Sequence, residues 1–123
     1  MKQLKKLENI EGKEDPEHQL YRAFTQIRTA EEAEWFLKDL CTPTELQAMA
    51  DRWRVIAPIK EGKSYRAIYE ETGVSITTIG RVARYFREGM GGYDLIYKRL
   101  EKRQHVTKAK TENSNSKERK VTR

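Results

Sequence analysis

Hydrophobic and polar residues follow one another along residues 16–103 with the period of an α-helix. Apolar side chains recur every three or four positions, which gathers them on one face of a helix. This spacing occurs in four stretches: Leu20, Phe24 and Ile27; Ala33, Phe36, Leu37 and Leu40; Leu46, Met49, Trp53 and Ile56; and Ile96 with Leu100. No stretch alternates as a β-strand would. The sequence therefore predicts an all-α fold of short amphipathic helices.

The ends of the first two helices are marked by capping residues. Pro16 suits the first position of a helix, so a helix is expected over residues 16–28. Thr29 and Glu32 form a capping-box pattern, in which side-chain oxygens accept from backbone N–H groups that the helix leaves open. A second helix is therefore expected to run from Thr29 to Leu40.

Residues 42–45, TPTE, are the strongest helix start in the chain. They combine an N-cap, a proline at the first helical position and a glutamate three residues after the cap. A long helix is expected to follow and to kink or break near Pro58. Proline removes one backbone hydrogen bond and clashes with the preceding turn. Glu61 and Gly62 then end the element.

Residues 64–87, SYRAIYEETGVSITTIGRVARYFR, are the most informative stretch. Ser64 is a good N-cap for a short helix, and Gly73 can end that helix because glycine adopts a left-handed backbone at low cost. Ser75 then caps a second helix that begins at Ile76. These are the proportions of a helix-turn-helix that reads DNA, with a plain helical hairpin as the alternative.

The two helices of this stretch have an inward and an outward face. The inward positions are apolar: Ile68, Val74, Ile79 and Val82. The outward face of the second helix is small and hydroxylated at its start and cationic further along: Ile76, Thr77, Thr78, Gly80, Arg81 and Arg84. Threonines can read base edges and arginines hold phosphates, so this face suits a helix whose first turn enters the major groove.

The chain ends are expected to be less ordered than its middle. Residues 1–15 are predicted to be a mobile segment, 16–103 a helical domain with a last amphipathic helix over 93–103, and 104–123 a disordered basic tail. Residues 101–123 hold eight Lys or Arg against three Glu, a balance of +5 out of the chain's +6. The tail is either a solvating end or an arm that adds sequence-independent phosphate contacts.

Composition narrows the possible chemistry. With 37% hydrophobic and 36% charged residues in a chain of 123, the core of a monomer would be thin, so a homodimer is expected. One cysteine and two histidines, His18 and His105, make a zinc site improbable, and no cofactor is expected. No cluster of nucleophile or metal-binding carboxylates indicates an enzyme. Without a signal peptide or a long apolar run, the chain is expected to be cytoplasmic, with no membrane partner.

The order of these elements resembles the tryptophan repressor (TrpR) family, and more closely its YerC/YecD-type branch. The resemblance covers roughly residues 20–100. It rests on four pieces taken together: LCTPTE at 40–45, RWRVI at 52–56, the Glu61-Gly62 stop, and residues 64–81. It implies a TrpR-like multi-helical fold with a helix-turn-helix, in which two chains form an intertwined homodimer whose first and last helices cross over.

The resemblance also implies roles for particular residues. The positions that match the family's DNA contacts are Arg66, Tyr69, Ile76, Thr77, Thr78 and Gly80. In tryptophan-responsive members, one arginine stacks on the indole ring of the ligand and a second holds its carboxylate. Arg52 and Arg81 match these two, and Thr42 matches a position near them.

Val82 replaces the glycine with which such an effector pocket admits a flat ring. Its branched side chain would occupy part of that volume. Tryptophan is therefore not expected as a corepressor, and the sequence identifies no other. The alternative roles for Arg52 and Arg81 are phosphate contacts or ion pairs with Asp51 and nearby glutamates.

Together these observations predict a sequence-specific DNA-binding transcription regulator. Its partner is double-stranded DNA, and we expect a repressor that acts as a homodimer on a two-fold symmetric operator. The alternatives are a helical protein-interaction module and a non-specific nucleic-acid-binding module. A protein-docking face would be apolar, whereas the predicted face has a cationic border: Arg66, Arg81, Arg84 and Arg87.

Overall fold

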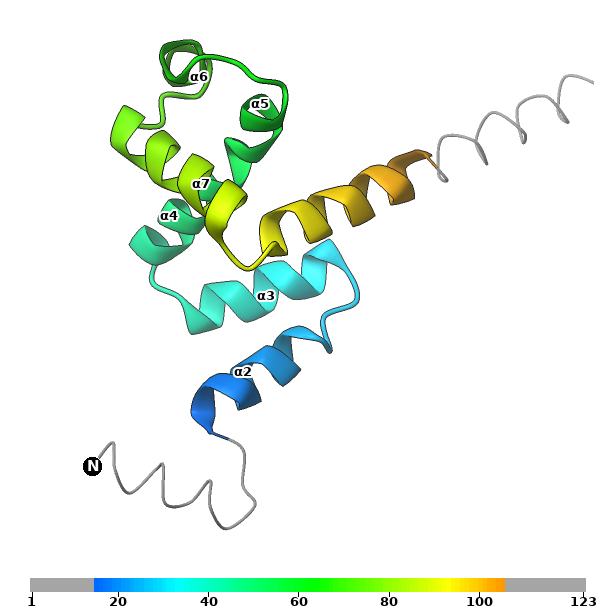
Figure 1. The fold of residues 1–123 in the computed structure, drawn as a ribbon. Helices are drawn as coiled ribbons and strands as arrows, with labels where there is room; N and C mark the ends of the chain where they lie inside the picture. Colours follow the sequence, from blue (N-terminus) through cyan, green and yellow to red (C-terminus); the bar gives the residue numbers. More distant parts are fainter. Residues whose placement is uncertain (1–14, 106–123) are drawn as a thin grey trace, which may run out of the picture. The chain divides into compact units, whose positions relative to one another are not determined.

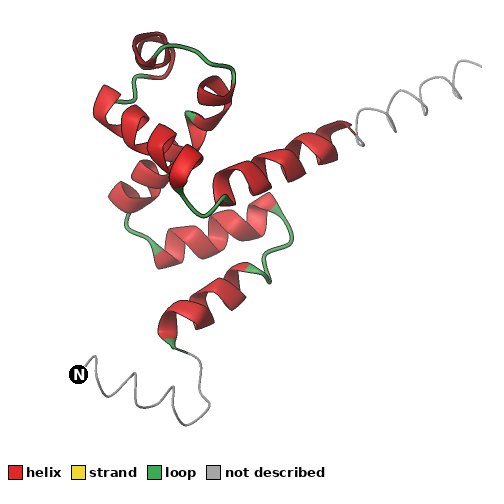
Figure 2. Cartoon of the chain, in the orientation of Figure 1, coloured by secondary structure: helices red, strands yellow, loops and turns green. Residues whose placement is uncertain are grey.

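The computed structural model describes residues 15–105, and this part of the chain consists of helices joined by loops (Figures 1 and 2). The predicted mobile segment 1–15, apart from Asp15, and the tail from residue 106 onward lie outside the described residues. Within residues 15–105 there is no strand, which confirms the all-α prediction. The helices are α2 (Pro16–Phe24), α3 (Ala30–Leu40), α4 (Pro43–Arg54), α5 (Ile56–Lys60), α6 (Tyr65–Thr72), α7 (Ile76–Glu88) and a last helix over residues 92–105.

The chain forms two compact units that divide between Leu46 and Gln47. In the first unit, Phe24 of α2 and Phe36 of α3 meet edge to face, with ring centroids 5.6 Å apart. This is a favourable aromatic geometry, but neither helix has a fully buried residue. The apolar stripes of α2 and α3 are thus only partly covered within the chain.

Helix α2 is shorter than predicted. It starts at Pro16 as expected, with Asp15 Oδ1 accepting from the backbone N–H of His18 at 2.8 Å, but it ends at Phe24 instead of Arg28. The hydroxyl of Thr25 donates to the carbonyl of Arg22. The next backbone bonds span three residues, a tightening that is common at helix ends.

The capping residues of α3 and α4 behave as predicted. Thr29 Oγ1 accepts from the N–H of Glu32 at 3.1 Å. Thr42 Oγ1 accepts from the N–H of Glu45 at 3.2 Å, and Glu45 Oε1 accepts from the N–H of Thr42 at 2.9 Å, which completes a capping box. The hydrogen bond from the Thr42 backbone holds the pKa of Glu45 below its usual value.

The long helix after the TPTE start is broken, as predicted, but at Val55 and not at Pro58. Pro58 has no N–H to donate to the carbonyl of Arg54, and its ring would clash with that carbonyl in a continuous helix. Ending α4 at Arg54 removes the conflict, because Pro58 then lies in the first turn of a new helix, α5. The break therefore lies one turn before the proline that causes it.

The core of the second unit lies among α5, α6 and α7, which contact one another in all three pairings (Figure 1). Its residues are at most 5% exposed: Val55, Ile56, Ile68, Val74, Ile79 and Val82. The four residues predicted to face inward from α6, the turn and α7 are all among them. Burial of these branched aliphatic side chains is the main favourable contribution to the packing of the three helices.

The last helix extends further than predicted. Residues 92–105 are helical up to the last described residue, whereas a helix over 93–103 and disorder from Gln104 were expected. No glycine or proline follows Tyr93 in this stretch to end the helix, so Gln104 and His105 continue it.

The turn at Gly73 leads to a test of the local backbone. Gly73 has φ +75°, and a Cβ there would meet no atom within 4 Å, so only the left-handed backbone disfavours a side chain. We expect Gly73→Ala to lower the free energy of unfolding by roughly 1–2 kcal/mol, as measured by urea denaturation. Gly92→Ala is the control, because its Cβ also has open space but its φ is not positive. Equal losses in both variants would contradict this account.

Candidate nucleic-acid interface

Two serine caps and a threonine build the segment from α6 to α7. Ser64 Oγ accepts from the N–H of Ala67 at 3.1 Å, and Ser75 Oγ accepts from the N–H of Thr78 at 3.2 Å. Between the helices, Thr72 Oγ1 donates to the carbonyl of Ile68 at 2.7 Å and accepts from the N–H of Val74 at 3.1 Å. These bonds satisfy backbone groups that the helix ends leave open, so the turn holds α7 in a defined direction from α6.

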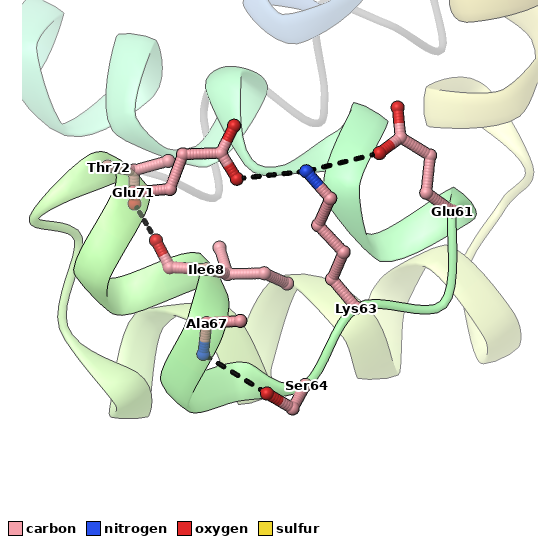
Figure 3. A network of polar contacts seen from close by, with 7 residues as sticks. All are labelled: Glu61, Lys63, Ser64, Ala67, Ile68, Glu71 and Thr72. Carbon is pink, nitrogen blue, oxygen red and sulfur yellow. Dashed lines mark hydrogen bonds and ion pairs between the residues drawn. The ribbon is translucent and has the colours of Figure 1, made fainter.

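Lys63 ties the loop before α6 to the elements on both sides of it (Figure 3). Its Nζ lies 3.1 Å from Glu71 Oε2 in α6 and 3.4 Å from Glu61 Oε2 at the end of α5. The hydrogen bond to Glu71, and next that to Glu61, raises the pKa of Lys63. Sequence analysis missed this bridge because it joins residues eight positions apart across a loop, where neither helical nor strand periodicity applies.

The face predicted to contact DNA lies on the surface. Ile76 at the start of α7 is 50% exposed and Tyr69 of α6 is 48% exposed. Thr77, Arg81 and Arg84 of α7 and Arg66 of α6 are also exposed, while Thr78 and Gly80 are half-buried. The exposed residues come from both helices of the pair.

Thr77 and Thr78 differ in what their hydroxyl groups do. Thr78 Oγ1 accepts a hydrogen bond from Ser75 Oγ at 3.0 Å and belongs to the cap of α7. Within residues 15–105, Thr77 makes no side-chain hydrogen bond, and its side chain is exposed. The hydroxyl of Thr77 is therefore free to meet a base edge, whereas that of Thr78 is used in the cap. Thr78 thus helps to orient the first turn of α7, which carries Thr77.

Gly80 lies against Tyr65, a residue of α6 that sequence analysis did not select. A Cβ on Gly80 would meet Tyr65 Cε2 at 3.7 Å, which is an ordinary van der Waals distance. The fold thus leaves room for a methyl group at this position. Tyr65 is 38% exposed, so its ring forms part of the same surface as Tyr69.

Two arginines of this face form ion pairs on their own helices. Arg66 Nε lies 3.3 Å from Glu70 Oε1, and Arg84 Nε lies 3.4 Å from Glu88 Oε2. All four side chains are more than 60% exposed, so these pairs contribute little to stability. Each pair uses only the Nε–H of the guanidinium and leaves its terminal NH2 groups for another acceptor.

The four residues of the candidate effector pocket differ in burial and in their partners. Val82 is 2% exposed and belongs to the core with Val55 and Ile79. Arg52 and Arg81 are exposed and pair with no carboxylate of residues 15–105.

Asp51, a candidate partner of the two arginines, accepts instead from Gln47 Nε2 at 2.9 Å. Thr42 lies in the first unit, where its hydroxyl caps α4. The valine side chain therefore packs into the hydrophobic core, while both arginines extend into solvent.

Residues 15–105 contain neither a metal-binding cluster nor a membrane-spanning helix. No group of three or more His, Cys, Asp or Glu side chains is arranged to hold a metal ion. None of the helices in this range is long and apolar enough to cross a membrane.

Comparison with known proteins agrees with the helical architecture. The family model for the Trp repressor protein matches residues 17–101. The chain is 33% identical over 104 residues to the uncharacterized protein YerC of Bacillus subtilis strain 168, covering 85% of this chain and 98% of YerC.

Two crystal structures are similar to this one. A TrpR-like protein from Eubacterium eligens ATCC 27750 matches with a TM-score of 0.63 and 36% identity, over 68% of this chain and 86% of that one. A candidate Trp repressor from Staphylococcus aureus matches with a TM-score of 0.67 and 33% identity, over 74% of this chain and 91% of that one. The all-helical fold is that of the TrpR-like class of proteins. The chain belongs to the Trp repressor family.

Gly80 gives a test of the geometry of this face. Glycine inside a helix costs about 0.5–1 kcal/mol relative to alanine, and the fold has room for the added methyl group. We expect Gly80→Ala to raise the free energy of unfolding by about this amount in urea denaturation. A loss of stability would show that the ring of Tyr65 cannot accommodate the methyl group.

Proposed function

We propose that the protein is a sequence-specific transcription regulator, a repressor that binds double-stranded DNA as a homodimer on a two-fold symmetric operator. The observation that carries the proposal is the first turn of α7. The inner side of α7 is buried in the core, and Ser75 caps the helix. The first turn then presents the exposed side chains of Ile76 and Thr77. Membership of the Trp repressor family supports the DNA partner. A regulator of this kind acts in the cytoplasm.

The exposed residues divide into base-reading and phosphate-binding groups. Ile76 and Thr77 are proposed to face base edges in the major groove, with Gly80 allowing close approach one turn later. Arg66, Tyr69 and Arg84 are proposed to hold phosphates on either side. Thr78 is proposed to act indirectly, through its hydrogen bonds with Ser75, which caps α7. Because the ion pairs of Arg66 and Arg84 are exposed and weak, a phosphate oxygen can replace the carboxylate in each.

The uncovered apolar surface supports a dimer. Trp35 of α3 is 64% exposed, Leu40 is 47% exposed, and Leu95 and Leu100 of the last helix are 50% and 42% exposed. Amphipathic helices bury such stripes in stable proteins, and a second copy of the chain would supply the missing surface. Two-fold symmetry then presents two α7 helices roughly 34 Å apart, the length of one DNA turn.

The division of roles predicts different consequences for two substitutions. Thr77→Ala should reduce the ratio of affinities for a selected operator and for random DNA, because one base-edge contact is lost. Arg84→Ala should weaken binding to both DNAs by a similar factor and lower the slope of log affinity against log salt by about one. Fluorescence anisotropy with labelled duplexes at several salt concentrations measures both quantities.

Glu88→Gln is the matched control for Arg84, because it removes the ion-pair partner without touching the arginine and should not weaken binding. Genome-wide capture of bound DNA supplies the operator. Equal affinity of the wild-type protein for captured and random sequences at physiological salt would indicate a non-specific nucleic-acid binder. Absence of DNA binding would leave a protein-interaction module.

A further expectation concerns the effector. We propose that free tryptophan is not a corepressor, because the side chain of Val82 is packed into the core and would have to leave it to make space for an indole ring. Calorimetric titration of the purified protein with L-tryptophan should show no saturable binding, and operator affinity should not depend on tryptophan. Tight binding accompanied by tryptophan-dependent DNA affinity would contradict this proposal.

A further inference from the structure

The last helix, 92–105, has apolar residues on two different faces. Tyr93 and Tyr97 pack against the core of the second unit, and their rings lie 6.5 Å and 6.4 Å from the ring of Trp53 in α4. Ile96 and Leu100, one helical turn apart, are 45% and 42% exposed. One face of the helix is thus attached to the unit that carries α7, and another is available to a second chain.

The connection between α7 and this helix does not by itself fix the direction of the helix. Residues 89–92 are Gly-Met-Gly-Gly, and the Met90 side chain is fully exposed. Gly91 has φ +84°, and a Cβ on Gly89 would lie 2.4 Å from the carbonyl oxygen of Tyr85, so both positions require glycine. Because no side chain of this connection is packed, the direction of the last helix must be set by contacts made elsewhere.

Besides the packing of Tyr93 and Tyr97 on the core and on Trp53, Lys60 contacts the last helix from the end of α5. Its Nζ lies 3.1 Å from Asp94 Oδ1 and 4.4 Å from the centre of the Tyr97 ring. The Lys60 side chain is 24% exposed, so it forms both an ion pair and a cation–π contact in a partly desolvated place. Lys60 is also the last residue of α5, only a few residues before α6 begins. One side chain therefore joins the α5–α6 region to the last helix.

We propose that Lys60 is a positioning residue that sets the angle between the last helix and the α6–α7 pair, and thereby the separation of the two DNA-reading helices in the dimer. The inference rests on the proposed function. If the last helix contributes to the dimer face through Ile96 and Leu100, any change in its direction moves α7 relative to the two-fold axis. The bridge from Lys60 to Asp94 and Tyr97 then determines which half-site spacing the protein prefers.

Asp94 also provides the matched control. Lys98 Nζ lies 2.8 Å from Asp94 Oδ2, but Lys98 belongs to the same helix. The Lys98 hydrogen bond lowers the pKa of Asp94 more than the Lys60 hydrogen bond does. Lys98→Ala therefore removes the larger electrostatic contact of Asp94 and leaves the bridge between helices intact, whereas Lys60→Ala removes the bridge.

The experiment uses the full-length chain and duplexes chosen by the wild-type protein from random sequence. Affinities are measured for the selected two-half-site duplex, for the same duplex with its half-sites moved one or two base pairs closer or further apart, and for a single half-site. For Lys60→Ala we expect roughly tenfold weaker binding to the selected duplex, a flattened preference among spacings, and unchanged affinity for the single half-site. Lys98→Ala should behave as wild type. Lys60→Arg, which keeps the charge and the contact with the ring, should restore the preference.

The outcomes separate this inference from the function on which it rests. If Lys60→Ala keeps the wild-type spacing preference, or weakens half-site and full-site binding equally, the positioning role is wrong while the regulator stands. If the wild-type protein selects no sequence, the function fails and the inference fails with it. Should Lys60→Ala lose its helical circular dichroism, Asp94→Asn removes the charge at constant shape and must flatten the spacing preference in the same way.

Discussion

The burial of Ile68 and Ile79 against one another and against Val55 and Ile56 is the constraint on which the rest of the structure depends. These four side chains are completely buried; three of them come from α5, α6 and α7, and Val55 is the residue at the break before α5. Since α5 has only five residues, it cannot be stable by itself and exists because its apolar side is covered. Because Pro58 breaks the long helix, α5 need not continue the direction of α4 and can pack its apolar side against this core. These buried contacts also determine where the exposed side chains of α6 and α7 lie.

The ends of the helices are fixed by uncharged groups more than by ion pairs. Ser64 and Ser75 cap α6 and α7, and Gly73 supplies the left-handed residue between them. The ion pairs on this surface join residues four positions apart on one helix. Because they are exposed, salt and competing phosphates weaken them. This division suits a DNA-binding surface, because the serine caps depend less on salt than the exposed ion pairs do, and the charged groups remain available for exchange with phosphates.

The features that could be predicted from the sequence are those with a local cause. The capping role of Thr42, the left-handed Gly73 and the inward position of Val82 each follow from a few neighbouring residues, and the structure confirms them. The position of the break at Val55 was predicted one turn too late, because a proline acts on the carbonyl four residues before it.

The contacts that sequence analysis missed join residues far apart in the chain. They are Tyr65 with Gly80, Lys63 with Glu71, and Lys60 with Asp94. No periodicity connects such pairs: the first and last depend on how one helix crosses another, and the Lys63–Glu71 pair depends on the path of the loop before α6. Most residues of the candidate site could thus be predicted to be exposed, with Thr78 and Gly80 half-buried instead, but the side chains that hold the site in place could not be predicted.

The distribution of charge explains why geometry matters for the proposed function. Residues 101–123 carry +5 of the chain's +6, and on the α6–α7 surface Glu70 and Glu88 offset Arg66 and Arg84. A surface with so small an excess of positive charge attracts DNA weakly from a distance. Under the proposed function, discrimination between DNA sequences then depends on how well two α7 helices fit into two major grooves at once. In the proposed dimer, that fit depends on the angle between each α7 and the two-fold axis. A single half-buried lysine that joins α5 to the last helix can therefore influence which DNA is recognised without contacting DNA itself.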